Sequence, residues 1–191
     1  MPFEYYRRLG RTDKATYRKS DDVIALKLPD PAALLPAIAA IGEGLRADDR
    51  SAVGKAVRSL SDGICVQLGA TPLTVRVLAK RPVRSDAELH GLYEREEDGT
   101  SVIRVWMRTA AHERPVSFRT FVRTLLHELC HHFDFELLKL RDTFHTEGFF
   151  KRESSLARQL LPPSERRRKA PAAIEEPAPP PPPKRGQLGL F

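Results

Sequence analysis

The chain has 191 residues, of which 41% are hydrophobic and 30% are charged, a composition typical of a soluble globular domain with its own core. It contains no run of about 18 apolar residues, which excludes a membrane-spanning helix, and its first residues lack the apolar stretch of a secretory signal. Its only cysteines are Cys65 and Cys130, too few for a disulfide framework or a four-cysteine zinc ribbon. We therefore expect a cytoplasmic protein with no membrane partner.

The positive charge is concentrated at the two ends of the chain. The net charge is +7, and residues 1–20 hold six Lys or Arg against two acidic residues, a balance of +4. Residues 162–191 hold six Lys or Arg against three acidic residues, a balance of +3, whereas residues 21–161 hold 20 basic and 20 acidic residues. Basic ends of this kind predict non-specific contact with a polyanion such as DNA. Their alternative role is to keep disordered ends in solution.

The first part of the chain predicts a short strand and two helices. Residues 23–28 are mainly apolar and suit a strand, and residues 31–45 are rich in Ala, Leu and Ile and predict a helix. A second helix is expected to begin at Asp49 or Ser51, because apolar residues then recur at three- and four-residue spacing. Gly69 is expected to end it.

Strand patterns follow. Residues 73–78 alternate and are β-branched, which predicts one strand. Residues 89–95 and 101–108 flank Asp98-Gly99, a pair typical of a hairpin turn. We therefore predict a small sheet that contains this hairpin.

The last ordered part of the chain predicts two helices. Ser117 is a suitable cap for a helix over residues 118–140, and a final helix is expected over residues 147–161. Residues 162–186 are rich in proline and predict a disordered basic tether. Residues 21–161 should therefore form one α+β domain, with N-terminal helices, a three- to four-stranded sheet and two C-terminal helices, behind a basic segment over residues 1–20.

The sequence His127-Glu128-Leu129-Cys130-His131 lies within the first of these C-terminal helices. Residues four apart project from one face of a helix, so the two imidazoles can hold one zinc ion. Glu128 can then take a proton from water at the open metal position and pass it to the leaving amine of a peptide. The motif predicts a zinc-activated hydrolase.

A catalytic zinc needs a third protein ligand. His145, fourteen residues beyond the motif, is the preferred candidate because the chain can leave one helix, turn and return at the start of the next. Glu147 and Glu153 are the carboxylate alternatives. Asp134 shares a helix face with the first histidine and is expected to orient a ligand histidine, with direct ligation as its alternative role. His132 points about 100° away from its neighbour and is expected to be no ligand.

A strand hairpin, the His127–His131 motif, and His145 followed four residues later by Phe149 resemble the SprT-like zinc metallopeptidases over roughly residues 73–161. The resemblance implies a compact zincin fold. It also implies that the three histidines hold the zinc ion and that the glutamate of the motif is the general base. The chain lacks the cysteines of the zinc ribbon that several members of the family carry.

In a zincin the edge strand before the motif helix usually borders the cleft. We therefore expect one strand to bind an extended protein substrate by strand addition. The strand assigned to this role comprises Val102, Ile103, Arg104, Val105, Trp106 and Met107.

The chain ends in Gln187-Leu188-Gly189-Leu190-Phe191. This pentapeptide resembles Gln-Leu-x-Leu-Phe, by which bacterial replication and repair proteins dock on the DNA sliding clamp. Leu190 and Phe191 would enter an apolar pocket while Gln187 makes polar contacts at its rim. The alternative is a terminus with no role.

Peptidase and clamp peptide together predict a zinc endopeptidase at the nucleoid that degrades DNA-associated or DNA-crosslinked proteins. A regulatory peptidase that cleaves one partner or repressor is an alternative. A catalytically silent, zinc-bearing adaptor for DNA and clamp is another, although a structural zinc site would have no use for Glu128.

Overall fold

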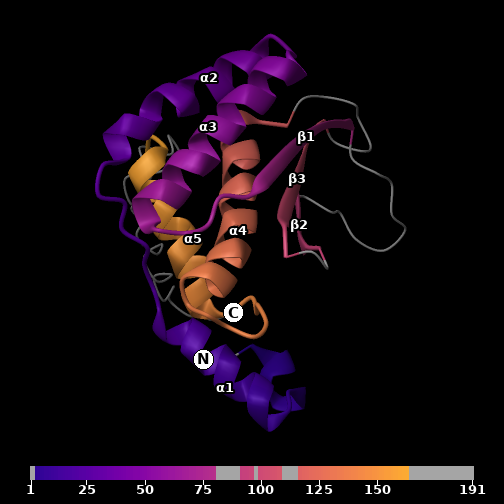
Figure 1. Cartoon of the computed structure of the whole chain (residues 1–191), viewed down its shortest axis with the longest axis vertical. Helices are drawn as coiled ribbons and strands as arrows, with labels where there is room; N and C mark the ends of the chain where they lie inside the picture. The colour runs from indigo at the N-terminus through magenta and orange to yellow at the C-terminus, as the bar shows by residue number, and fades with distance from the viewer. Residues whose placement is uncertain (1–2, 81–90, 97–98, 109–115, 164–191) are drawn as a thin grey trace, which may run out of the picture.

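The computed structural model describes residues 3–80, 91–96, 99–108 and 116–163. Within these residues the chain has an α+β fold with five α-helices, two 3-10 helices and one three-stranded sheet (Figure 1). In chain order the elements are η1 (Glu4–Arg8), α1 (Arg11–Asp22), η2 (Pro31–Leu34), α2 (Leu35–Arg46), α3 (Arg50–Leu68), β1 (Thr74–Lys80), β2 (Gly91–Arg95), β3 (Ser101–Arg108), α4 (Phe118–Glu136) and α5 (Glu147–Leu160).

Helix α4 lies at the centre, between the sheet and α5 (Figure 1). It packs on β2 and β3 on one side and on α5 on the other, while α3 packs on β1 and on α2. The core joins these layers through fully buried side chains such as Ile64, Ile103, Leu125 and Leu129. The helix that carries the histidine motif is therefore held firmly on several sides.

Side-chain caps begin the principal helices at the positions that the sequence predicts. Asp49 accepts a hydrogen bond from the backbone N–H of Ala52 at the start of α3, and Ser117 accepts one from Thr120 at the start of α4. Gly69 ends α3 with a φ of 70°, the left-handed conformation that glycine adopts without strain. The predicted helix over residues 31–45 is divided between η2 and α2.

The predicted hairpin is confirmed, but its second strand is not at the edge of the sheet. The strand order is β1-β3-β2, with β3 parallel to β1 and antiparallel to β2. Val102 pairs with Thr74 on one side and Glu94 on the other. The assignment of residues 102–107 as a substrate-binding edge strand is therefore wrong. Their nearly continuous apolar run is the pattern of a strand that is buried on both faces.

The predicted strand over residues 23–28 is also wrong. This segment forms no regular secondary structure, and its backbone bonds to side chains of α5 instead of to another strand. Gln159 accepts from the N–H of Leu28, and Gln159 and Ser155 both donate to the carbonyl of Leu26. Polar side chains on one helix thus replace the partner strand that an apolar run suggests.

Residues 3–22 belong to the folded body. Helix α1 packs on α5, and Tyr17 on α1 is only 1% exposed. The sequence predicts no helix over residues 11–22, because the segment is mostly polar and buries only Thr16, Tyr17 and Ser20.

Helix α4 ends at Glu136, before the predicted end at residue 140. Lys139 has a φ of 50°, and the chain turns away there. Asp98 of the hairpin turn, the tether beyond residue 163 and the pentapeptide at 187–191 lie outside the described residues. Among the described helices, none is both long and apolar enough to cross a membrane.

Candidate metal centre

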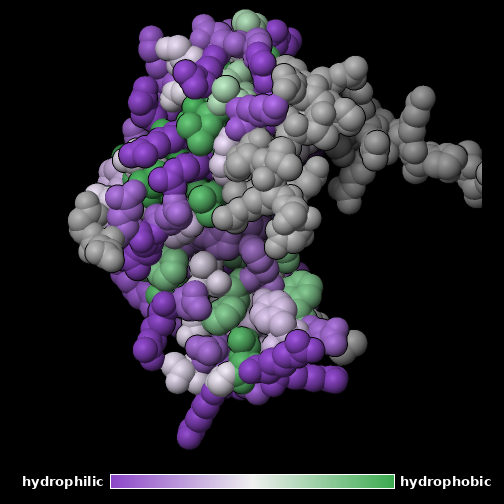
Figure 2. Space-filling model, turned by 90° about the vertical axis from the view of Figure 1, so that its right-hand side faces the viewer, coloured by the Kyte–Doolittle hydropathy of each residue, from purple (hydrophilic) through white to green (hydrophobic). Residues whose placement is uncertain are grey.

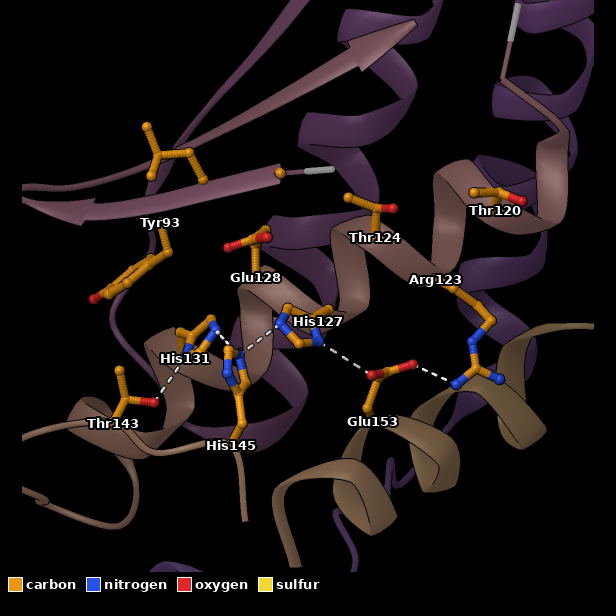
Figure 3. Close-up of a pocket in the computed structure, with 12 residues that line it drawn as sticks. Tyr93, Thr120, Arg123, Thr124, His127, Glu128, His131, Thr143, His145 and Glu153 are labelled. Carbon is orange, nitrogen blue, oxygen red and sulfur yellow. Dashed lines mark hydrogen bonds and ion pairs between the residues drawn. The ribbon is translucent and has the colours of Figure 1, made fainter. Parts of the chain in front are cut away.

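Helix α4 and the loop that follows it bring three histidines together. His127 and His131 lie one turn apart on the same face of α4, and His145 lies just before the start of α5. The Nε2 atom of His145 is 3.0 Å from that of His127 and 3.1 Å from that of His131. Figure 3 shows the three rings turned toward one another. They lie close enough to bind one metal ion.

The donor set fits a tetrahedral metal site. Three nitrogens at about 2.0–2.1 Å from a zinc ion would be roughly 3.3 Å apart. The Nε2 atom of His145 is 3.0 and 3.1 Å from those of the other two histidines, and the ligand atoms all lie within 4.8 Å of one another. The other ring nitrogen of His127 and of His131 is engaged by a neighbouring side chain. The atoms that remain for a metal are therefore the ones that converge.

Glu153 on α5 fixes the orientation of His127. Its Oε2 lies 3.2 Å from His127 Nδ1, and its other oxygen pairs with Arg123. Burial opposes ionisation of Glu153, but the hydrogen bond from His127 and the Arg123 guanidinium outweigh it and hold the pKa of this carboxyl below its usual value. A carboxylate only accepts hydrogen bonds, so His127 turns an Nδ1 proton toward Glu153 and its Nε2 toward the other two rings.

Thr143 orients His131. Its hydroxyl donates to Asp134 Oδ2 at 2.8 Å and lies 2.7 Å from His131 Nδ1. Asp134 is fully buried and also accepts from Arg152 at 2.6 Å. Burial raises the pKa of Asp134, while Arg152 and Thr143 act in the opposite direction and both donate hydrogen bonds to its oxygens. The sequence predicted that Asp134 orients one of the motif histidines. In the structure Asp134 contacts Thr143, and Thr143 in turn contacts His131.

His131 and His145 are held in the form that binds a metal. Burial, followed by the neighbouring His127, lowers the pKa of both His131 and His145, and that of His131 falls to about 3. A neutral imidazole is the ligating species. Phe149 lies against all three rings, at centroid distances of 4.6 to 5.1 Å, and excludes water from one side.

Glu128 lies next to the histidines and forms no salt bridge within the described part of the chain. It is only 6% exposed and lines a pocket of about 600 Å³ that also contains the three histidines. Burial raises its pKa to about 7, although the charge of His127 and the backbone N–H of Tyr93 oppose the shift. A carboxyl group with a pKa near neutrality can both accept and return a proton.

Strand β2 borders this pocket. Gly91, Leu92 and Tyr93 line it opposite α4 (Figure 3). Among the described residues β2 has only one partner strand, so it is the edge that residues 102–107 were expected to provide. A Cβ at Gly91 would lie 2.5 Å from Glu128 Oε1. The strand therefore needs glycine at this point to approach the glutamate.

Other residues that the sequence analysis considered for the site have partners elsewhere. His132 donates from Nε2 to the carbonyl of Thr71 and bonds through Nδ1 to the Tyr93 hydroxyl, on the sheet side of α4. Glu147 is half-exposed and pairs with Lys151 four residues later. Arg104 pairs with Glu94 on the neighbouring strand.

Sequence reasoning missed Thr143, Arg152 and Gly91. Thr143 and Arg152 act on a histidine through another side chain, and such contacts leave no spacing pattern in the chain. Gly91 lies within the strand predicted over residues 89–95, and an isolated glycine in a strand is a known signal of close backbone approach.

Comparison with family models, curated proteins and solved structures finds no match to this chain. The function is therefore inferred from the geometry of the site.

Proposed function

We propose that this chain is a zinc-dependent endopeptidase. One observation carries the proposal: three imidazole nitrogens converge while a buried carboxylate beside them stays free of cationic partners among the described residues. A structural zinc site has four protein ligands and no need of such a carboxylate, whereas a catalytic site has three and an open position. The resemblance to SprT-like metallopeptidases supports the same assignment.

The roles of the residues follow from their positions. His127, His131 and His145 would hold the zinc ion, and Glu153 and Thr143 orient two of them. When bound, zinc polarises a peptide carbonyl and lowers the pKa of water. Glu128 takes the proton of the attacking water and delivers it to the amine as the peptide bond breaks, which yields a carboxylic acid and a free amine.

The substrate would be an extended segment of protein. The edge of β2 that has no partner strand among the described residues can add such a segment as a further strand, which would run past Glu128 along the pocket.

The proposed natural substrates are proteins bound or crosslinked to DNA. The exposed side chains of Arg7, Arg8, Arg11, Arg18 and Lys19 lie at one end of the molecule. This end, at the bottom of Figures 1 and 2, is largely hydrophilic. Such a surface suits phosphate contacts, which are independent of base sequence and weaken as salt rises. With docking of residues 187–191 on the sliding clamp, it would place the enzyme at the nucleoid.

Replacement of Glu128 tests the catalytic proposal. We expect Glu128→Gln to lower peptidase activity on DNA-bound proteins by at least about 100-fold, because a general base contributes about 10²–10⁴-fold, and to leave zinc content unchanged. Glu136→Gln, on the same helix but bonded to Thr71, is the control and should keep full activity. Unchanged cleavage by Glu128→Gln would refute the proposal. DNA-independent cleavage of a single protein would favour the regulatory alternative.

Recruitment has its own test. Sliding clamp should be recovered with the full chain and lost after deletion of Leu190 and Phe191, since these two apolar side chains would fill the pocket on the clamp. The control replaces Glu175 and Glu176 in the tether with Ala. Equal recovery with the truncated chain would discredit recruitment and leave the peptidase proposal untouched.

A further inference from the structure

The third histidine differs from the other two in how the chain supports it. His127 and His131 are fixed by α4, whereas His145 lies in the irregular segment between α4 and α5. Loops without regular backbone hydrogen bonds depend on side chains from elsewhere for a fixed conformation. The position of His145 therefore has to be explained by contacts that lie far away in the sequence.

The N-terminal segment, Phe3–Val23, supplies these contacts. The hydroxyl of Tyr5 donates to the backbone carbonyl of His145 at 2.9 Å, across 140 positions of sequence. Phe3 lies edge-on to Phe150 at 6.0 Å, and Phe150 in turn stacks on the His145 ring at 5.8 Å. The segment thus touches His145 through its main chain and supports its ring.

A second set of contacts holds the residues just after His145. Asp21 accepts a hydrogen bond from the backbone N–H of Gly148 at 2.7 Å, and the hydroxyls of Ser20 and Thr146 are 3.4 Å apart. A Cβ at Gly148 would collide with the backbone of Asp21. This close approach fixes the start of α5 against the end of α1.

A third set reaches His131. Arg152 is fully buried and donates to the carbonyls of Ser20 and Val23 as well as to Asp134. Asp134 holds Thr143, and Thr143 bonds to His131. The N-terminal segment is therefore connected to two of the three histidines, once directly and once through a chain of buried polar groups.

We propose that the N-terminal segment is a positioning element of the metal centre, and that Tyr5 and Asp21 hold His145 where it can bind the ion. The inference rests on the metal site of the proposed function. It assigns to the basic N-terminus a role that its composition does not suggest. The surface that offers positive charge to a polyanion and the contacts that place a metal ligand belong to the same short piece of chain.

Single-atom substitutions test this inference in the full-length protein. Tyr5→Phe removes only the hydroxyl that contacts His145. Tyr6→Phe is its matched control, because the Tyr6 hydroxyl accepts from Arg18 and not from the metal loop. We expect Tyr5→Phe to weaken zinc affinity, measured by competition with a chelator, by roughly threefold to tenfold, the effect of one lost hydrogen bond. Tyr6→Phe should leave it unchanged.

Asp21 allows a rescue experiment. Asp21→Ala should also weaken zinc affinity, whereas Asp21→Asn keeps an oxygen that can accept from Gly148 and should restore most of it. Asp22→Ala removes the same charge at an exposed neighbouring position and is the control. The visible spectrum of bound Co²⁺ should change in Tyr5→Phe and Asp21→Ala and not in the two controls, because it reports the ligand geometry.

A double-mutant cycle separates a positioning role from general destabilisation. In a His145→Ala background, Tyr5→Phe should have no further effect on metal affinity, since the ligand that it positions is gone. An equal loss in both backgrounds, or equal affinities of Tyr5→Phe and Tyr6→Phe, would overturn the inference while the metal site stands. A wild-type chain that binds no zinc would overturn the proposed function and the inference together.

Discussion

The proton of a single hydroxyl decides which nitrogen of His131 can face a metal. Thr143 has one hydroxyl proton, and it donates this proton to the Asp134 carboxylate. Its oxygen must then accept from His131 Nδ1, which leaves Nε2 with a lone pair. Glu153 holds His127 through Nδ1, so that its Nε2 also faces the other rings. Two independent neighbours thus prepare both histidines of α4 for one ion.

Gly91 is predicted to be required for activity because its lack of a side chain leaves room for Glu128. In Gly91→Ala the new Cβ would displace Glu128, and the φ of Gly91 is not positive, so only steric contact changes. We expect proteolysis to fall by roughly 100-fold, the scale of a misplaced catalytic group, with zinc content retained. Gly54→Ala, where nothing lies within 4 Å of the new Cβ, should keep full activity and gain about 0.4–1 kcal/mol of stability. Full activity of Gly91→Ala would show that Glu128 tolerates displacement.

The raised pKa of Glu128 predicts a pH effect on the stability of the metal-free protein. Burial moves this pKa from 4.5 to about 7, so between these values the folded chain binds more protons than the unfolded chain. Its free energy of unfolding therefore falls as pH rises through this window. Glu128→Gln has no buried carboxyl to ionise. Its free energy of unfolding relative to wild type should therefore increase by on the order of 2–3 kcal/mol from pH 4.5 to 7. Parallel stability curves from chemical denaturation would contradict this.

At the scale of elements, local signals located the helices that carry the site. Ser117 capped α4 where the sequence predicted, and the apolar stripe of α4 is buried as its spacing requires. Helix α1 escaped prediction because its attachments are polar and distant: Ser20 and Asp21 bond to residues more than 120 positions away. Periodicity reports a buried apolar face and cannot report such contacts.

The buried pair of Arg152 and Asp134 joins α5 to α4, and each residue depends on the other. Arg152→Met should destabilise the protein by about 3–5 kcal/mol, because it leaves a buried carboxylate without its cation. Adding Asp134→Leu should recover part of this loss, which a double-mutant cycle of unfolding free energies would measure. Arg158→Met, at an exposed position of α5, should change stability by less than about 0.5 kcal/mol. Additive losses for Arg152→Met and Asp134→Leu would contradict the coupling.

At the scale of the whole molecule, the sequence predicted the α+β class and the histidines that meet, but not the order of the strands. Two histidines four residues apart on a helix must project from one face, so the sequence could show that they meet. The strand order depends on which apolar strand is covered on both sides. Residues 101–108 contain a nearly continuous apolar run, which indicates burial on both faces but does not identify the partner strands. The parallel pairing with β1 could therefore not be inferred from them.

The metal content of the full-length protein tests the central claim most directly. The purified wild-type chain should contain about one zinc ion, in line with a site of three histidine ligands. His145→Ala should lose most of it, because two ligands from one helix bind far more weakly than three. His132→Gln, a neighbour that bonds to Thr71 instead, is the control and should keep the ion. A wild-type chain without zinc, or a His145→Ala variant with a full complement, would contradict a metal centre built from these three histidines.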